Sequence, residues 1–264
     1  MITSLKNDRV KYVRSLQNRR RVRQRERRFV FEGMRLVEEA VRAGIPPAFV
    51  FYTEPAETSE QGRHLLASLR EMNTPCYAVS EPVMVACSDT ETPQGILAVL
   101  PIPNLPRPER PALTLVLDRV RDPGNLGAIL RTALAARVEQ VLLAPGTVDG
   151  SNPKVVRAAM GAHLRLPVAA LKWEAIAEAV AGGDVWIAAA GGETVYTAAD
   201  WTRPVALIVG SEATGAGERA QALAQGRVSI PMAAGVESLN TAMATAVILF
   251  EAVRQRTVER RSAA

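Results

Sequence analysis

The feature that most constrains this chain is a strand pattern that passes through a short turn directly into a helix pattern. Residues 113–117 have the apolar and β-branched composition of a buried strand, the turn is Asp-Pro-Gly-Asn at 122–125, and a helix is expected over 127–136. A helix N-terminus after such a turn exposes free backbone N–H groups, which bind polar or anionic ligands. The pattern favours an α/β fold with a candidate binding site, although many α/β proteins have this turn without a ligand.

The second half of the chain repeats this alternation of strand and helix. Near-continuous apolar strands between helices are typical of a parallel sheet that is covered on both faces. Because knotted chains are very rare, an ordinary doubly wound sheet is the physical default. The expected strands cover 113–117, 140–143, 185–190, 205–209 and 228–230, and the expected helices cover 127–136, 154–162, 173–180 and 239–256.

Residues 29–100 have the pattern of a smaller domain in which short strands and helices alternate, which predicts a small α/β sandwich. The expected strands cover 29–31, 48–52, 76–79 and 95–100, and the expected helices cover 33–43 and 60–71. The next eleven residues, 101–111, contain five prolines. Such a segment forms neither a helix nor a central strand, so we interpret it as the linker between two domains.

The positive charge of the chain is concentrated at its N-terminus. Residues 1–28 contain eleven Lys or Arg and two Asp or Glu, a net charge of +9. The remaining residues contain 21 basic and 25 acidic side chains, a net charge of −4. Arginine dominates, and its guanidinium suits bidentate phosphate contacts and stacking on exposed bases. We therefore predict a basic RNA-binding arm over 1–28, with a solvated basic face or a disordered tail as the alternative. The predicted RNA contacts are Arg19, Arg20, Arg21, Arg23 and Arg25.

Composition argues against several other classes of protein. No apolar run approaches the roughly 20 residues that span a bilayer, and no apolar segment follows the basic N-terminus as in a signal peptide. The two cysteines, Cys76 and Cys87, lack the spacing of a disulfide framework or a zinc site and suit a reducing cytoplasm. The turn after residue 117 also lacks the GxGxxG spacing of a dinucleotide site. We expect no membrane segment, no metal and a cytoplasmic location.

Two later segments strengthen the case for a binding site at 122–132. They read Gly210-Ser211-Glu212-x-x-Gly215, and Ile230-Pro231-Met232 followed by Ser238-Leu239-Asn240. Together with Asn125-x-Gly127-Ala128-Ile129-x-Arg131-Thr132, they resemble the three motifs of the SpoU (TrmH-like) branch of the SPOUT RNA methyltransferases. The segment 152–162 adds to the match. Residues 31–33 (Phe-Glu-Gly) and 92–95 (Thr-Pro-Gln-Gly) are similar to that family's RNA-substrate-binding domain.

The resemblance implies the fold and the reaction. It implies a parallel SPOUT sheet with a C-terminal trefoil knot over 112–264 and a smaller N-terminal, L30e-like α/β domain over 29–100. It further implies a homodimer that transfers a methyl group from S-adenosylmethionine (SAM) to a ribose 2′-hydroxyl. Ribosomal (23S) RNA is favoured as the substrate, because a separate N-terminal domain accompanies the ribosomal RNA enzymes of the family. The alternatives are a transfer RNA 2′-O-methyltransferase and an RNA-binding protein with an inactive methyltransferase domain.

The resemblance also assigns catalytic roles. Arg131 would hold an RNA phosphate and stabilise developing oxyanion charge, and because arginine stays protonated it is a poor general base. Asn125 would orient the substrate or Arg131, with a helix N-cap as the simpler alternative. Glu212 and Asn240 complete the predicted active site together with Ser238, for which a helix cap is again the alternative.

The donor contacts and the dimer interface follow from the same resemblance. Gly210 and Gly215 lack a Cβ and so permit close backbone approach to the donor, and Ile230, Met232 and Leu239 would complete the pocket. The broad apolar face of the final helix is expected to contribute to the dimer, and Phe250 on this face is either an interface or a core residue.

Overall fold

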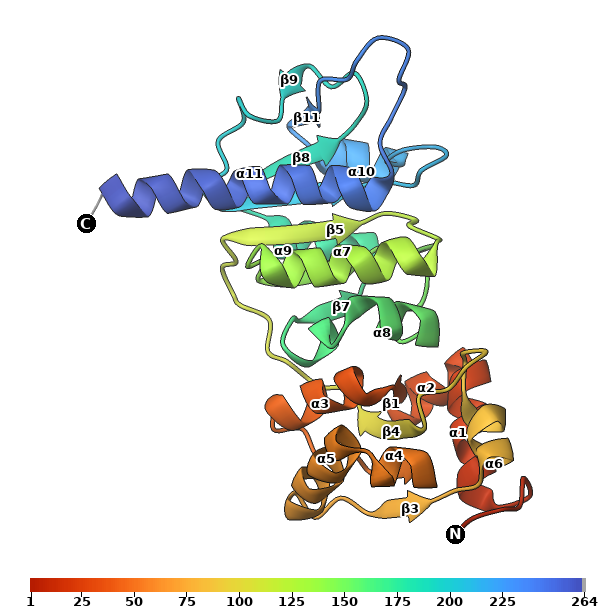
Figure 1. Ribbon diagram of the computed structural model, residues 1–264. Coiled ribbons are helices and arrows are strands. Elements are labelled where there is room, and N and C mark those ends of the chain that lie inside the picture. The colour runs from red at the N-terminus through yellow and green to blue at the C-terminus, as the bar shows by residue number, and fades with distance from the viewer. Residues whose placement is uncertain (263–264) are drawn as a thin grey trace. The chain divides into compact units, whose positions relative to one another are not determined.

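The computed structural model describes residues 1–262, and its side chains through residue 259. The chain forms two compact units (Figure 1). The first contains Met1–Pro103 and Ser151–Arg165, and the second contains Asn104–Gly150 and the chain from Leu166. Residues 151–165, which the sequence places in the C-terminal domain, thus pack with the first unit, where Val156 and Leu164 are buried in its core.

The first unit has a four-stranded sheet with the order β1 (Arg28–Glu32), β4 (Ile96–Pro101), β2 (Phe49–Tyr52) and β3 (Cys76–Ala78). The β1–β4 and β4–β2 pairs are antiparallel, and the β2–β3 pair is parallel. Its further helices are α3 (Met34–Arg42), α4 (Glu54–Thr58), α5 (Glu60–Glu71), α6 (Glu81–Cys87), α8 (Pro153–Ala159) and the 3₁₀ turn η1 (Ala162–Leu164). Phe31 packs into the core formed with α3 and α5, and Val30 into the core with α6, so helices cover both faces of the sheet.

The basic N-terminal segment is an integral part of this unit and not a separate arm. It forms α1 (Asp8–Asn18) and α2 (Arg20–Glu26). Val10, Val13 and Leu16 of α1 are fully buried against the sheet. Removing residues 1–28 would therefore expose an apolar core as well as remove charge.

Arg23 does not fit the role predicted for it. Only 4% of this residue is exposed, so its guanidinium is not available to RNA. Its Nη1 donates hydrogen bonds to the carbonyls of Leu16 (2.8 Å) and Gln17 (3.2 Å), and its Nε donates to Ser151 Oγ (3.3 Å). These carbonyls belong to the last turn of α1, where helical carbonyls lack intrahelical donors. Arg23 thus stabilises the end of α1 and its junction with α2.

The second unit confirms the predicted parallel α/β architecture. The sheet order is β7 (Val168–Ala170), β6 (Gln140–Leu143), β5 (Leu113–Leu117), β10 (Val205–Val209), β8 (Asp184–Ala188), β11 (Gly226–Ser229) and β9 (Thr194–Val195). Neighbouring strands are parallel throughout. Its helices are α7 (Pro123–Ala135), α9 (Trp173–Val180), α10 (Glu218–Leu223) and α11 (Thr241–Ser262). Helices α9 and α10 cover one face of the sheet, and α7 and α11 pack together on the other (Figure 1).

The last strand lies between two earlier strands that a short connection joins. Strand β11 pairs with both β8 and β9, and residues 189–193 connect β8 to β9. This connection crosses the backbone of β11 so closely that a Cβ at Gly192 would lie 2.8 Å from the Arg227 carbonyl oxygen. Ser229 Oγ on β11 also donates to the Gly192 carbonyl (2.8 Å). The C-terminal strand thus lies between β8 and β9 and directly against the connection that joins them.

Replacing Arg23 by alanine should lower the free energy of unfolding by about 2–3 kcal/mol, because it removes charge-assisted hydrogen bonds from a buried site. Urea denaturation of the full chain measures this change. Arg21→Ala removes an exposed arginine from the same helix and should change stability by no more than about 0.5 kcal/mol. Equal stability of the two variants would show that the Arg23 hydrogen bonds contribute little.

Candidate active site

The strand order of the second unit places a candidate site at the carboxyl ends of two central strands. Strands β5 and β10 are neighbours, β6 and β7 lie beyond β5, and β8, β11 and β9 lie beyond β10. In a parallel sheet, a point where the strand order reverses leaves a crevice at the carboxyl ends of the strands, and ligands bind there. The turn after β5 leads into α7 at these strand ends, and the segment after β10 carries the predicted glycines.

A cavity of about 540 Å³ lies at these strand ends, within the size range of small-molecule sites. It is formed by the segments that follow β8, β10 and β11, together with the start of α11. All five residues predicted to hold the donor line it, as do three of the predicted catalytic residues. These lining residues are Gly210, Gly215, Ile230, Met232 and Leu239, and Glu212, Ser238 and Asn240.

The loop after β10, residues 210–217, is a narrow hairpin that requires glycine at position 210 and favours it at position 215. We call it the β10 loop. Ser211 and Gly215 exchange backbone hydrogen bonds of 3.1 and 2.8 Å. A Cβ at Gly210 would lie 2.2 Å from the Gly215 carbonyl carbon, and Gly215 itself has a φ of +62°. The sequence predicts close approach of the donor at these glycines, whereas at Gly210 the close neighbour is the returning limb of the loop itself.

Three predicted catalytic side chains form one hydrogen-bonded chain. Asn125 Nδ2 donates to Glu212 Oε1 at 2.6 Å, and Asn240 Nδ2 donates to Asn125 Oδ1 at 3.0 Å. These residues come from the first turn of α7, the β10 loop and the start of α11. These hydrogen bonds therefore join the three sequence motifs, and two of the side chains, Glu212 and Asn240, line the cavity.

The residues that cap helices α7 and α11 are not the two, Asn125 and Ser238, that the sequence offered as possible caps. Helix α7 begins at Pro123, and its N-cap is Asp122, whose carboxylate accepts from the Asn125 N–H at 2.7 Å. Asn240 caps α11, since its Oδ1 accepts from the Ala242 N–H at 2.9 Å. Neither Asn125 nor Ser238 is a helix cap, so the simpler explanation for their presence is wrong.

Arg131 stands apart from this group. It lies six residues beyond Asn125 on α7, about 9 Å farther along the helix axis. Its side chain is exposed, and it does not line the cavity. The part of the chain that the structure describes gives it no hydrogen-bond or ion-pair partner. Within one copy of the chain, Arg131 is thus free to contact another molecule.

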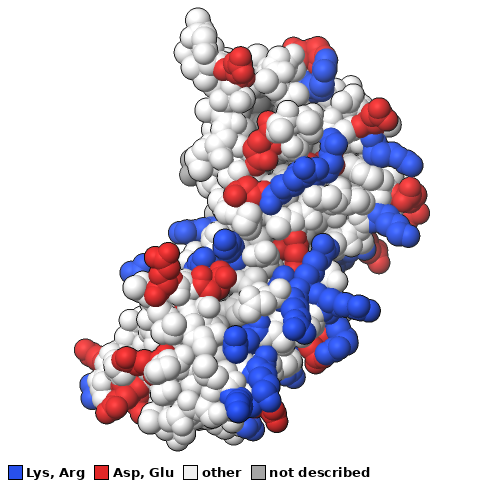
Figure 2. Space-filling view, turned by 90° about the vertical axis from the view of Figure 1, so that its right-hand side faces the viewer, with Lys and Arg blue, Asp and Glu red and all other residues white. Residues whose placement is uncertain are grey.

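Four of the five arginines predicted to bind RNA are exposed: Arg19, Arg20, Arg21 and Arg25. Arg25 forms an ion pair with Glu26 (2.8 Å), which leaves most of its surface accessible. Figure 2 shows Lys and Arg side chains gathered over one side of the first unit. Lys11 and Arg14 of α1 line a shallow groove with Arg19, so they add to this basic surface although the sequence did not single them out.

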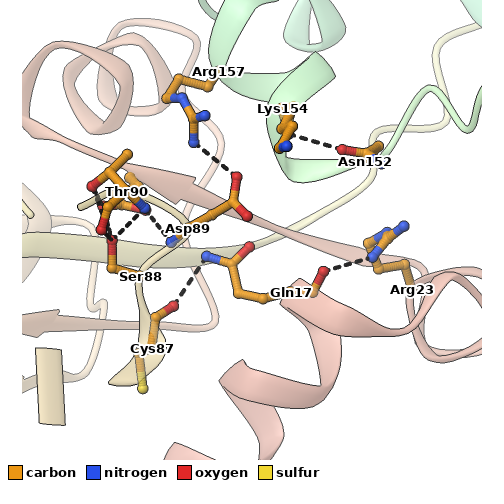
Figure 3. Close-up of polar contacts among 10 residues, drawn as sticks. Gln17, Arg23, Cys87, Ser88, Asp89, Thr90, Asn152, Lys154 and Arg157 are labelled. Carbon is orange, nitrogen blue, oxygen red and sulfur yellow. Dashed lines mark hydrogen bonds and ion pairs between the residues drawn. The ribbon is translucent and has the colours of Figure 1, made fainter. Parts of the chain in front are cut away.

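The Phe-Glu-Gly motif of the first unit fixes a loop beside this surface. Glu32 accepts hydrogen bonds from the Asp89 N–H (3.0 Å) and from Thr90 Oγ1 (2.6 Å). On the opposite side of the loop, Arg157 of α8 pairs with Asp89 at 3.0 Å (Figure 3). Lys154, one turn earlier on α8, is exposed, and its backbone N–H donates to Asn152 Oδ1 at 2.9 Å (Figure 3). Glu32 thus organises the loop, because both of its carboxylate oxygens accept hydrogen bonds from it.

Membrane and metal sites receive no support from the described residues. Residues 1–262 contain no helix that combines the length and the apolar character needed to cross a bilayer. The same range contains no group of three or more His, Cys, Asp or Glu side chains that could hold a metal ion. Of the two free cysteines, Cys87 is buried and Cys76 is half-buried. Burial raises the pKa of the Cys87 thiol to about 11, which keeps it protonated and unreactive near neutral pH.

Comparison with known proteins also divides the chain in two, between residues 98 and 112, and includes residues 151–165 in the C-terminal match. Residues 112–250 match the SpoU rRNA Methylase family, and residues 7–98 match an MRM3-like substrate binding domain. The chain is 33% identical to the 23S rRNA (guanosine(2553)-2′-O)-methyltransferase RlmP of Bacillus subtilis, over 94% of this chain and 97% of that protein. It is 32% identical to the 23S rRNA (uridine(2479)-2′-O)-methyltransferase of Streptomyces viridochromogenes, over 97% and 92% of the two chains.

The structural comparison agrees. The crystal structure of the SpoU methyltransferase AviRb from Streptomyces viridochromogenes, in complex with the cofactor AdoMet, superposes with a TM-score of 0.86 and 30% identity. The match covers 96% of this chain and 99% of that one. The family match spans the strands, the β10 loop and the hydrogen-bonded chain of Asn125, Glu212 and Asn240. On this evidence, the chain belongs to the SpoU rRNA methylase family.

Proposed function

We propose that this protein transfers a methyl group from SAM to a ribose 2′-hydroxyl of ribosomal RNA. The observation that carries the proposal is the meeting of three loops at the cavity, where Asn125, Glu212 and Asn240 form one hydrogen-bonded chain. Family relatives with this domain arrangement are named 23S rRNA 2′-O-methyltransferases, which favours ribosomal over transfer RNA. An inactive RNA-binding protein would not need these three side chains to be assembled.

The cavity fits SAM by its size and by its lining. Its volume of about 540 Å³ lies within the 300–1,000 Å³ typical of cofactor sites. Ile230 and Leu239 provide apolar walls, and the β10 loop brings backbone groups to the cavity. Bound there, SAM would supply a methyl group that its positive sulfonium already activates. The residues present are therefore compatible with this donor, and none of the proposed roles requires a metal.

The side chains around the cavity would align the ribose hydroxyl with the donor and stabilise charge. Alignment alone can supply on the order of 7 kcal/mol of the barrier reduction. Asn125 is held by Glu212 through its amide nitrogen and by Asn240 through its amide oxygen, so its orientation is fixed before substrate binds. Arg131 is proposed to hold an RNA phosphate, whose oxygen, or a water beside it, accepts the hydroxyl proton. This assignment suits its exposure and its lack of a partner in the described chain.

We also propose that the protein is a homodimer formed along α11. Met243, Val247 and Phe250 form a stripe on this helix and are 56%, 37% and 49% exposed. We call these three residues the α11 stripe. An exposed contiguous apolar patch of this kind marks an interaction site. Because α7 packs against α11, a partner seated on the stripe would lie near α7, which carries Arg131. An active site shared between subunits would explain the separation of Arg131 from the cavity.

A trefoil knot is the further element of the proposal. The position of β11 between β8 and β9, against the short connection that joins them, supports it, since the chain must pass an earlier loop to reach α11. Knotted connections are very rare in unrelated folds. Loops held in a knot would provide a rigid wall for the cavity.

Arg131→Lys should abolish most methyl transfer while SAM binding stays close to that of the wild type. Lysine keeps the charge but loses the planar, bidentate guanidinium. Transfer of labelled methyl groups to ribosomal RNA measures the first property, and calorimetric titration with SAM measures the second. Arg137→Lys, a second arginine just beyond α7, is the control and should retain activity. Wild-type activity of Arg131→Lys would exclude Arg131 from the chemistry.

Replacing Arg19, Arg20, Arg21 and Arg25 by glutamine should weaken RNA binding and lower its dependence on salt. Each lost phosphate contact reduces the slope of log K against log salt by about 0.7–0.9, so the loss of four contacts should reduce it by about 3–4. A matched control removes four exposed arginines from α3 and α5 instead, namely Arg35, Arg42, Arg63 and Arg70. If both variants change the slope equally, RNA binding depends on net charge and not on this surface.

Phe250→Glu should yield a folded monomer that binds SAM more weakly than the wild-type dimer. Phe250 is half exposed, so the substitution spares the core, but an unpaired charge in an apolar interface is costly. The opposite side of α11 lines the cavity through Ala244 and Ile248, which links dimer packing to SAM affinity. Light scattering after size exclusion measures the mass, and Val195→Glu on the edge strand β9 is the control. A monomeric wild type, or a dimeric Phe250→Glu, would contradict the proposed interface.

A further inference from the structure

The buried carboxylate of Asp118 contacts the β10 loop. It is separate from the hydrogen bonds that join Asn125, Glu212 and Asn240. Asp118 follows the last residue of β5 and is only 2% exposed. Its Oδ2 accepts a hydrogen bond of 2.7 Å from the backbone N–H of Gly217. A buried carboxylate is expensive unless it is paired and hydrogen-bonded. Its partners therefore indicate what it holds.

The second partner of Asp118 is its neighbour Arg119. Arg119 Nε lies 3.4 Å from Asp118 Oδ1, and Arg119 Nη2 donates to the Gly215 carbonyl at 3.4 Å. The two side chains thus contact the backbone of the returning limb of the β10 loop at two points, Gly215 and Gly217. A Cβ at Gly217 would lie 2.7 Å from Arg119 Nη2, so a larger residue there would displace this contact.

Arg119 is itself held in an unusual backbone conformation. Its φ is +58°, a left-handed value that costs energy for a residue with a side chain. The conformation is fixed because the Arg119 N–H donates to Thr147 Oγ1 at 3.0 Å. Thr147 Oγ1 in turn donates to the Leu117 carbonyl at 2.8 Å. This strained turn directs the guanidinium toward the β10 loop.

The β10 loop is consequently restrained at three places. Its outgoing limb continues from β10, its Glu212 accepts from Asn125, and its returning limb is held by Asp118 and Arg119. Gly210, Glu212 and Gly215 of this loop line the cavity. The restraint from Asp118 and Arg119 thus acts on the cavity wall without either residue lining the cavity.

We propose that Asp118 and Arg119 are positioning residues that hold the β10 loop in its SAM-binding conformation. This inference rests on the proposed function, which places SAM in the cavity. Without the two side chains, the loop samples other conformations. The apparent affinity for SAM then equals the intrinsic affinity multiplied by the fraction of molecules whose loop is in the SAM-binding conformation. SAM at saturating concentration selects the competent loop, so the rate of methyl transfer at saturation is retained.

The test compares Asp118→Asn, Arg119→Gly and Arg119→Lys in the full-length protein. Glycine suits the positive φ of residue 119, so the whole side chain is removed without straining the backbone, and this variant should fold. We expect Asp118→Asn and Arg119→Gly to raise the Kd for SAM by about tenfold, the typical effect of losing one charge-assisted hydrogen bond. Arg119→Lys should show a smaller increase, since one ammonium group keeps the charge but not the two-point contact.

Three measurements separate positioning from a merely structural role. These are the Kd for SAM by calorimetry without RNA, kcat at saturating SAM, and the Tm of the SAM-free protein. Positioning predicts a raised Kd with kcat and Tm close to wild type in Arg119→Gly. The matched control, Arg121→Gly, removes an exposed arginine from the same turn and should leave the Kd unchanged.

A wild-type Kd in Arg119→Gly and in Asp118→Asn would overturn the inference, and so would a loss of SAM affinity matched by falls in kcat at saturation and in Tm. These outcomes require a wild-type protein that binds SAM. If the wild type itself binds no SAM, the proposed function fails, and the inference fails with it.

Discussion

The hydrogen bonds of Asn125 to Glu212 and to Asn240 are the interactions on which the rest of the site depends. They join the first turn of α7 to two segments that lie 87 and 115 residues later in the sequence. Each bond contributes only about 0.5–1.5 kcal/mol, so these bonds cannot by themselves bring the segments together. The buried parallel strands do that, because β5 and β10 are neighbours and end at the same edge. The side-chain bonds then select one arrangement of loops that are already close.

The two units contribute different physical properties. The first unit supplies a basic surface on a well-packed scaffold, in which Val10, Val13 and Leu16 anchor the positively charged helix α1. The second unit supplies a cavity with little charge around it and an exposed apolar stripe on α11. Attraction of the RNA backbone depends on charge and salt, whereas donor binding depends on shape and backbone contacts. The division allows RNA affinity to change without altering the donor site.

Sequence patterns predicted the buried strands well and the polar contacts poorly. Strands β5, β6 and β10 have the predicted bounds, because an apolar run between helices has few other solutions in a parallel sheet. Strand β9 has only two residues and leaves no periodic signal. Helix α7 begins four residues earlier than predicted, because Pro123 is favourable at the first position and Asp122 caps it. The predicted donor residues do line one cavity, which motif order indicated but spacing alone could not.

Arginine illustrates why the remaining features could not be read from the sequence. The sequence does not distinguish among four arginines of the N-terminal segment, Arg19, Arg20, Arg21 and Arg23. In the structure, the helical period of α2 turns Arg23 toward the buried end of α1. The role of Arg119 also escaped prediction, because its left-handed backbone and its contact with Gly215 are long-range properties of the fold. Arg131 was singled out by the motif, but its distance from the cavity is set by the fold of α7 and leaves no trace in the motif.

The most direct test of the account is the position of the methyl group on the product. Purified protein would be incubated with unmodified ribosomal RNA and isotopically labelled SAM, and the labelled nucleotide would be identified by mass spectrometry after digestion. The account predicts that the label resides on a ribose 2′-oxygen at a defined nucleotide of 23S RNA. Label on a base, or no label on RNA with a protein that binds both RNA and SAM, would contradict it.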